Sequence, residues 1–375
     1  MKALQLTLSP SNWEHELFKI NIDADLFLLF VSPEFTAKQE LLDTISHSYP
    51  DALIIGCSTA GEISDIHVSD QTVSLTAIRM EKTGTRMATV KVAKMDKSLS
   101  AGRQLAKQLD DEDLRHILIF SDGLNVNGAD LVEGLRSELP NVSITGGLAG
   151  DGSDFKKTFT IDNQNISDKM IVGLGLYGDA LKVGYGSKGG WDSFGIERLV
   201  TKSDNNVLYE LDGLPALELY KSFLGEQANN LPSSGLLFPL SLRIHENSIP
   251  LVRTILAINE KAQSLTFAGN IPQGSYVRLM KANVDRLVGG AESSAKVAID
   301  SIKQTADLAI LISCVGRRLV LKQLVEEEVE AVRHVVGKNP IITGFYSYGE
   351  IAPFGEFSPC ELHNQTMTIT TLSEC

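Results

Sequence analysis

The sequence has little cysteine, few aromatic residues and no excess of positive charge. Its 375 residues include four cysteines, Cys57, Cys314, Cys360 and Cys375, which lie far apart and form no C-x-x-C pair. This spacing excludes a compact zinc or dithiol motif and is typical of free thiols in a reducing compartment. The net charge of −13 repels nucleic acid and anionic membrane surfaces. We therefore expect neither a nucleic-acid partner nor a membrane partner.

Long apolar runs are also missing. The first 18 residues, MKALQLTLSPSNWEHELF, place a proline, a tryptophan and two glutamates where a signal peptide needs an unbroken apolar stretch. No later run reaches the ~18 residues of a membrane-spanning helix. These absences predict a cytoplasmic protein.

What the sequence does contain is a repeat built around glycine turns. The decapeptide IIGCSTAGEI (54–63) matches ITGFYSYGEI (342–351) at both glycines, the glutamate and the two terminal isoleucines. A shorter third copy, ITGGLAGDG (144–152), keeps the first glycine and has Gly-Asp in place of Gly-Glu. Each copy follows an apolar run and a helical pattern, and precedes another apolar strand.

Each copy therefore predicts a β-α-β-β unit whose first two strands run parallel through a right-handed crossover. The segment from about residue 180 to 304 differs, because its apolar runs are spaced like antiparallel strands. We predict an α/β (mixed α+β) fold in which pseudo-repeated β-α-β-β units form mixed sheets flanked by helices. The chain is expected to make two packed domains, residues 20–200 and 201–375.

The first turn suggests a catalytic thiol, since Cys57 lies where a strand meets the turn and a base would activate it for nucleophilic attack. The repeats favour a different interpretation. Phe345 and Gly147 occupy the positions that match Cys57, so the turn does not require a thiol. A small buried hydrophobic residue is the alternative.

Hydroxyl and carboxylate groups on the turns offer two further interpretations. Hydroxyls on a tight turn suit a polar or anionic ligand, or they satisfy the turn's own backbone. The two glutamates could face each other as an acid/base pair, or accept hydrogen bonds at the turn. The glycines serve backbone conformation first and ligand access second. The candidate ligand-contacting residues are Cys57, Ser58, Thr59, Gly61, Glu62, Tyr346, Tyr348, Gly349 and Glu350.

The sequence contains neither a dinucleotide-binding fingerprint nor a paired-histidine metal motif. The string GLGLYG (173–178) has the G-x-G-x-x-G form but lies within an apolar strand with no helix after it, so it is not a dinucleotide fingerprint. None of the seven histidines forms an H-x-x-x-H pair. His67 and His363 follow the two Gly-Glu turns and His245 lies between two expected strands, so these three are the candidate metal ligands.

The stretches IIGCSTAGEI, ITGGLAGDGSDF, NVLYELDGLPALELY and GFYSYGEIAPFG, followed by ELHNQTMTI, together resemble the FIST family of sensory proteins. The resemblance covers nearly the whole chain and implies an N-terminal FIST domain followed by a FIST C-terminal domain. It implies a small-ligand sensor, and some stand-alone bacterial members are described as haem-binding nitric oxide sensors that regulate a histidine kinase.

On this resemblance we expect a sensor, not an enzyme, with non-covalent haem b held by one of the three histidines and a histidine kinase or other signalling protein as partner. An oligomer is compatible with the sequence. One alternative is a sensor of an amino acid or other small metabolite without haem. Another is an enzyme that uses Cys57 or the Glu62/Glu350 pair.

Overall fold

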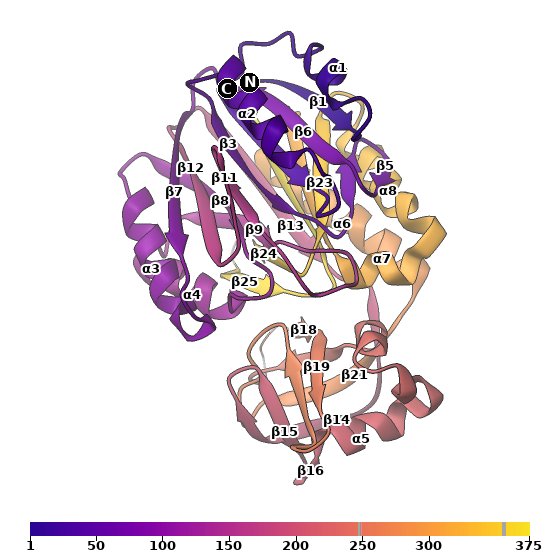
Figure 1. Ribbon diagram of the computed structural model, residues 1–375. Coiled ribbons are helices and arrows are strands. Elements are labelled where there is room, and N and C mark those ends of the chain that lie inside the picture. The colour runs from indigo at the N-terminus through magenta and orange to yellow at the C-terminus, as the bar shows by residue number, and fades with distance from the viewer. Residues whose placement is uncertain (247, 249, 355–357) are drawn as a thin grey trace.

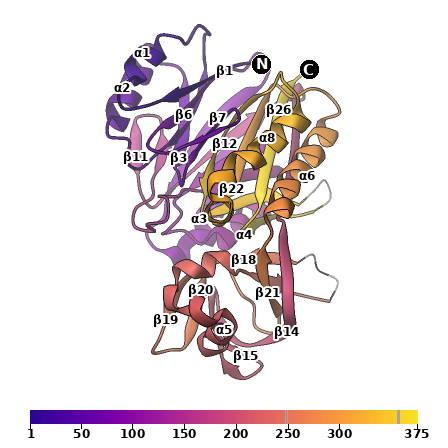
Figure 2. The same cartoon turned by 90° about the vertical axis from the view of Figure 1, so that its right-hand side faces the viewer.

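The computed structural model describes residues 1–375 except 247, 249 and 355–357. The chain forms a large lobe and a small lobe (residues 191–282), which lies below the large lobe in Figures 1 and 2. Three units make up the large lobe. Unit 1 spans residues 2–79, unit 2 spans 84–177, and unit 3 spans 181–374 with the small lobe inserted after its first strand.

Units 1 and 2 have closely similar element orders. Unit 1 contains β1 (Lys2–Leu8), α1 (Trp13–Leu17), β2 (Leu26–Val31), α2 (Lys38–Ser48), β3 (Leu53–Ser58), β4 (Glu62–Ser64), β5 (His67–Ser69) and β6 (Val73–Arg79). Unit 2 contains β7 (Gly84–Lys91), η1 (Met95–Lys97), α3 (Ser98–Leu109), β8 (Leu114–Ser121), α4 (Gly128–Glu138), β9 (Ser143–Leu148), β10 (Thr160–Asp162), β11 (Asn165–Ser167) and β12 (Met170–Tyr177).

Unit 3 follows the same order around the small lobe. Its own elements are β13 (Leu181–Lys188), α6 (Val284–Ile302), β22 (Leu308–Cys314), α7 (Val315–Leu321), η4 (Lys322–Leu324), α8 (Val325–Val336), β23 (Ile341–Ser347), β24 (Gly349–Pro353), β25 (Cys360–His363) and β26 (Met367–Glu374). The small lobe contains β14 (Trp191–Asp204), β15 (Val207–Leu211), β16 (Leu214–Pro215), α5 (Ala216–Leu224), η2 (Gly225–Asn230), η3 (Ser233–Leu237), β17 (Leu240–Arg243), β18 (Leu251–Arg253), β19 (Ile255–Asn259), β20 (Ser264–Phe267) and β21 (Tyr276–Ala282).

The mixed α/β class and the β-α-β-β units are confirmed. In each unit the two strands joined by the crossover helix are parallel, namely β2 with β3, β8 with β9, and β22 with β23. The strand after each glycine-turn hairpin runs antiparallel to the first of them. The predicted domain boundary at residue 200 falls inside β14, the first strand of the small lobe.

The three sheets of the large lobe share one strand order, and each borrows its last two strands from another unit. The orders are β1-β6-β2-β3-β10-β11, β7-β12-β8-β9-β24-β25 and β13-β26-β22-β23-β4-β5. The hairpin of unit 1 thus completes the sheet of unit 3, that of unit 2 completes unit 1, and that of unit 3 completes unit 2. This cyclic exchange gives the large lobe a pseudo-threefold arrangement.

The glycine turns lie where the hairpins cross between units. Three backbone hydrogen bonds close a ring there, from Ala60 N to Tyr346 O (2.8 Å), from Gly150 N to Ser58 O (3.0 Å) and from Tyr348 N to Leu148 O (3.1 Å). The matching first glycines lie against the neighbouring parallel strand. A Cβ added at Gly56 or Gly344 would come within 1.8 or 1.9 Å of a carbonyl oxygen, so no larger residue fits.

Aromatic side chains from all three units meet in the centre of the large lobe. Phe30, Phe120 and Phe345 pack together, with ring centroids 4.8 to 5.9 Å apart. Cys57 belongs to the same buried cluster. Burial of each such aromatic side chain stabilises the fold by roughly 1.5–3 kcal/mol. Within the described residues, no helix is both long and apolar enough to cross a membrane.

Candidate functional site

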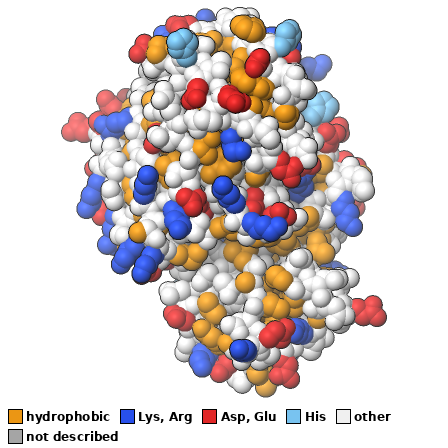
Figure 3. Space-filling model, in the orientation of Figure 1, with side chains coloured by type: hydrophobic (Ala, Val, Ile, Leu, Met, Phe, Trp, Pro, Cys, Tyr) orange, Lys and Arg blue, Asp and Glu red, His pale blue; other side chains and the backbone are white. Residues whose placement is uncertain are grey.

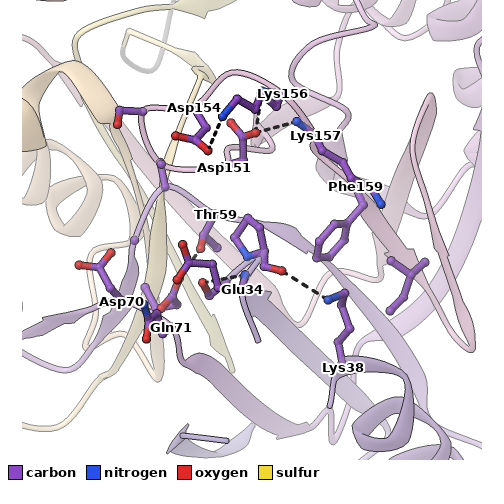
Figure 4. A pocket seen from close by; sticks show the side chains of 18 of the residues that line it. Glu34, Lys38, Thr59, Asp70, Gln71, Asp151, Asp154, Lys156, Lys157 and Phe159 are labelled. Carbon is purple, nitrogen blue, oxygen red and sulfur yellow. Dashed lines mark hydrogen bonds and ion pairs between the residues drawn. The ribbon is translucent and has the colours of Figure 1, made fainter. Parts of the chain in front are cut away.

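A cavity of about 870 Å³ opens in unit 1 beside the carboxyl ends of the parallel strands β2 and β3. Its walls are the segment after β2, the first residue of α2, the first glycine turn, the β5–β6 turn, and the loop and hairpin that unit 2 contributes (Figure 4). Ligands of α/β proteins bind at this end of parallel strands, because helix N-termini and loops converge there. The cavity is therefore the candidate binding site.

Two lysines in the cavity wall lack an ion-pair partner in the part of the chain that the structure describes. Lys38 donates to the carbonyl oxygens of Phe35 (3.0 Å) and Pro33 (3.4 Å), and Lys157 has no carboxylate within 4 Å. Burial, followed by the charge of Lys157, lowers the pKa of Lys38. The Lys38 ammonium lies 6.0 Å from the centre of the Phe159 ring. These cations leave positive charge available to an anionic group.

Acidic side chains line the rest of the cavity. Figure 4 shows Asp70 and Gln71 on the side opposite Lys157 and Phe159, with Glu34 between them. On the face of the large lobe drawn in Figure 3, basic and acidic side chains are intermingled. A cavity that holds both basic and acidic side chains favours a ligand that carries both charges.

Glu62 and Glu350 are buried and hydrogen-bonded in the same way. Thr59 donates to one oxygen of Glu62, while Thr72 donates to the other from its backbone (3.2 Å) and its hydroxyl (2.8 Å). Ser347 and Thr366 repeat this pattern at Glu350, at 2.7 Å and 3.0–3.1 Å. Burial is the largest influence, and it raises the pKa of Glu62 to about 7 and that of Glu350 to about 8.

The two glutamates do not face each other across the cavity. Glu62 lies in β4, which pairs with β23, whereas Glu350 lies in β24, which pairs with β9 in a different sheet. Glu62 lines the cavity and Glu350 does not. Each glutamate instead ties its exchanged hairpin to the start of the last strand of its own unit.

Asp151 holds the corresponding position in the third copy of the turn and organises the loop that roofs the cavity. Its carboxylate accepts hydrogen bonds from the backbone N–H groups of Phe155 (2.9 Å), Lys156 (2.7 Å) and Lys157 (2.6 Å). Tyr348 donates to Asp151 from unit 3 and stacks on Phe155, with centroids 4.4 Å apart. Asp151 and Tyr348 therefore fix the position of Lys157.

The other turn residues serve the scaffold. Cys57 and Ser58 are fully buried, burial raises the pKa of the Cys57 thiol well above its usual value, and Ser58 Oγ accepts from Phe159 N (3.1 Å). Tyr346 is buried and donates to Glu328 (2.6 Å). Of the nine candidates from the sequence, the cavity brings together Thr59, Gly61 and Glu62.

The three candidate histidines lie apart from one another and from the cavity. His67 is exposed and lies 3.3 Å from Glu326, and His245 is exposed in the small lobe. His363 is buried, its Nε2 lies 2.7 Å from Ala352 O, and burial lowers its pKa to about 4. Of the cavities described in this structure, none is lined by these side chains. The three histidines therefore do not contribute to the candidate cavity.

Sequence reasoning missed the lysines, Phe159 and Asp70, because these residues stand in separate segments with no motif. One signal was present. The stretch Asp70-Gln71-Thr72 matches Asn364-Gln365-Thr366, and Gln71 and Gln365 both have positive φ (60° and 64°). Extending the repeat past the turn would have identified the threonines that bind the glutamates and, beside them, the cavity wall.

Comparison with known proteins identifies the family. The FIST N domain matches residues 25–214, just over half of the chain, and the FIST C domain matches residues 216–353. The chain belongs to the FIST family. FIST domains are associated with sensory signal transduction and the binding of small ligands. In this FIST protein the N-domain match contains the whole cavity, and the boundary between the two matches falls within the small lobe.

Relatives of this FIST protein are uncharacterized. MJ1623 of Methanocaldococcus jannaschii is 26% identical over 381 residues, covering 89% of this chain and 71% of the relative. Rv0628c of Mycobacterium tuberculosis is 23% identical over 250 residues, 63% of each chain. The crystal structure of a cyanuric acid hydrolase from A. caulinodans aligns over 100% of this chain and 99% of its own, with 9% identity and a TM-score of 0.36. That score is too low to support any functional comparison.

Proposed function

We propose that this FIST protein is a cytoplasmic sensor that binds a small zwitterionic metabolite, such as an amino acid, in the unit 1 cavity. The observation that carries this proposal is that Lys38 and Lys157, which have no ion-pair partner among the described residues, share one cavity with acidic side chains. A volume of about 870 Å³ lies within the range of small-molecule sites. The signal would pass to a separate signalling protein, such as a histidine kinase.

The cavity residues suggest how such a ligand is oriented. Lys38 and Lys157 bind its carboxylate, and the Phe159 ring contacts its apolar part. Glu34 and Asp70 face its ammonium group. Thr59 and Glu62 form the floor, where the neutral form of Glu62 is favoured by burial.

Binding of metabolites to the purified protein tests the proposal. Calorimetric titration with each of the common L-amino acids should find at least one that binds, and Lys38→Met and Lys157→Met should each weaken it about 10- to 100-fold, since a hydrogen bond to a charged group contributes ~1.5–3 kcal/mol. Lys107→Met is the matched control, because Lys107 lies on α3 with a side chain 68% exposed. Unchanged affinity in both cavity variants, or no binding amino acid, would refute the proposal.

Haem-based nitric oxide sensing stays a prediction from the family resemblance. His67, His245 and His363 do not line the unit 1 cavity, so the metabolite sensor requires none of them. An absorption spectrum of protein titrated with haem decides between them. A Soret band that shifts with nitric oxide and disappears in one of the three single histidine variants supports haem, and a protein that stays colourless refutes it.

An enzymatic role has less support. The thiol of Cys57 is enclosed in a cluster of apolar side chains, and the two glutamates belong to separate sheets. We therefore propose binding without catalysis.

A further inference from the structure

Helix α7 carries two adjacent arginines, Arg317 and Arg318, whose side chains extend in opposite directions. Arg318 extends to the wall of the unit 1 cavity, and Arg317 extends into the core, toward the two connections between the lobes. These connections are residues 189–190, which lead from β13 into β14, and residue 283, which leads from β21 into α6. Figure 2 shows α6 and β22 beside the point where β14 and β21 pass to the small lobe.

Arg318 holds two parts of the cavity wall. Its guanidinium forms a two-pronged ion pair with Asp70, at 2.8 and 2.6 Å, and donates to Ala60 O at 2.7 Å. Gly61 makes room for it, since a Cβ there would lie 2.7 Å from the guanidinium. The Asp70 side chain is 66% exposed, so a ligand in the cavity can reach this carboxylate.

Arg317 holds both connections at once. It donates to Gly189 O (3.1 Å) and to Leu287 O (2.8 Å), which lie just before β14 and in the first turns of α6. Glu328 binds it at 2.7 and 3.0 Å, and both side chains are fully buried. Leu287 also packs with Trp191 and Leu321, the last residue of α7, in one buried cluster.

We propose that α7 couples occupancy of the unit 1 cavity to the position of the small lobe. This inference rests on the proposed function, since an ammonium group bound near Asp70 competes with Arg318 for that carboxylate. Loss of the Asp70 pair loosens the N-terminal half of α7. Arg317 is the preceding residue, so its hold on Gly189 and Leu287 weakens as well. The small lobe then carries the signal that a partner protein reads.

Hydrogen exchange in the ligand-free protein tests the coupling. Asp70→Asn should speed amide exchange about two- to fivefold in peptides that cover residues 187–192 and 283–289, because an ion pair with this exposure contributes at most ~1 kcal/mol. Asp168→Asn is the matched control. It removes the same charge from the same cavity, and Asp168 makes no ion pair with Arg318.

Unchanged exchange at both connections in Asp70→Asn, or an equal increase in Asp168→Asn, overturns the coupling. Arg318→Gln provides a second measurement, and its effect should not add to that of Asp70→Asn if the two side chains act as one pair. No ligand is added in these experiments. A failure to bind amino acids therefore refutes the proposed function, whereas normal exchange refutes the coupling.

Discussion

Glu350 is a buried carboxyl group that accepts three hydrogen bonds, and no described residue places a counter-charge within salt-bridge distance of it. Its donors are Ser347 Oγ, Thr366 N and Thr366 Oγ1, at 2.7 to 3.1 Å. These donors favour the charged form, but burial outweighs them and raises the pKa to about 8. Glutamine has the shape of the protonated acid, with its oxygen able to accept from Thr366. We predict that Glu350→Gln stabilises the protein at alkaline pH.

The size of the effect follows from proton linkage. The folded protein holds this proton up to about pH 8, whereas the unfolded chain releases it near the ordinary value of 4.5. The stability that this group contributes is thus full below pH 4.5 and is lost as the pH rises to 8. One pKa unit corresponds to ~1.4 kcal/mol, so the wild type loses roughly 4 kcal/mol of unfolding free energy across this window through Glu350 alone.

Urea unfolding at pH 5 and pH 8 measures this difference. The variant should be within ~1 kcal/mol of the wild type at pH 5 and roughly 2–4 kcal/mol more stable at pH 8. Glu226→Gln, at an exposed position of the small lobe, should change neither value. Glu62 titrates in both proteins and cancels from the comparison. If Glu350→Gln is less stable than the wild type at pH 8, the carboxylate is charged in the fold and the reasoning is wrong.

The remaining predictions concern the glycine turns. Gly344→Ala should lower the free energy of unfolding by more than ~3 kcal/mol or abolish folding, because the added Cβ would lie 1.9 Å from Leu311 O. Thermal unfolding measures this loss. A variant within ~1 kcal/mol of the wild type would contradict the close approach of the two strands. Cys57→Ala should bind ligand like the wild type and cost ~1–2 kcal/mol of core packing. Native Cys57 should not react with a thiol reagent until the protein unfolds, and rapid labelling of it would show that the thiol is accessible.

Local patterns in the sequence predicted the units well and the assembly poorly. The apolar runs and helical patterns place β2, α2 and β3 and their counterparts, because hydrophobic periodicity reflects which face each element buries. The exchange of hairpins has no such signal. The pattern of apolar and polar residues in β4, and the turn that follows it, would be the same whether β4 paired with a strand of its own unit or with β23. Only the three-dimensional arrangement reveals the pairing.

The candidate site was predicted only in part. The repeat identified Thr59, Gly61 and Glu62, but it gave equal weight to Tyr346 and Glu350, which are buried and do not line the cavity. The cavity residues Lys38 and Lys157 lie 119 positions apart in the sequence, and neither belongs to a motif. Such residues can be recognised as a site only from the folded structure, which places them in the wall of one cavity.

The exchanged hairpins have a consequence for what counts as a domain in this protein. A chain cut between residues 214 and 216, where the two family matches meet, would leave β4 without β23 and β9 without β24. Each fragment would present open sheet edges to other molecules and aggregate. The named domains are thus stretches of sequence and not independent folding units. Removal of any one unit would likewise leave the sheet that its hairpin completes without its last two strands.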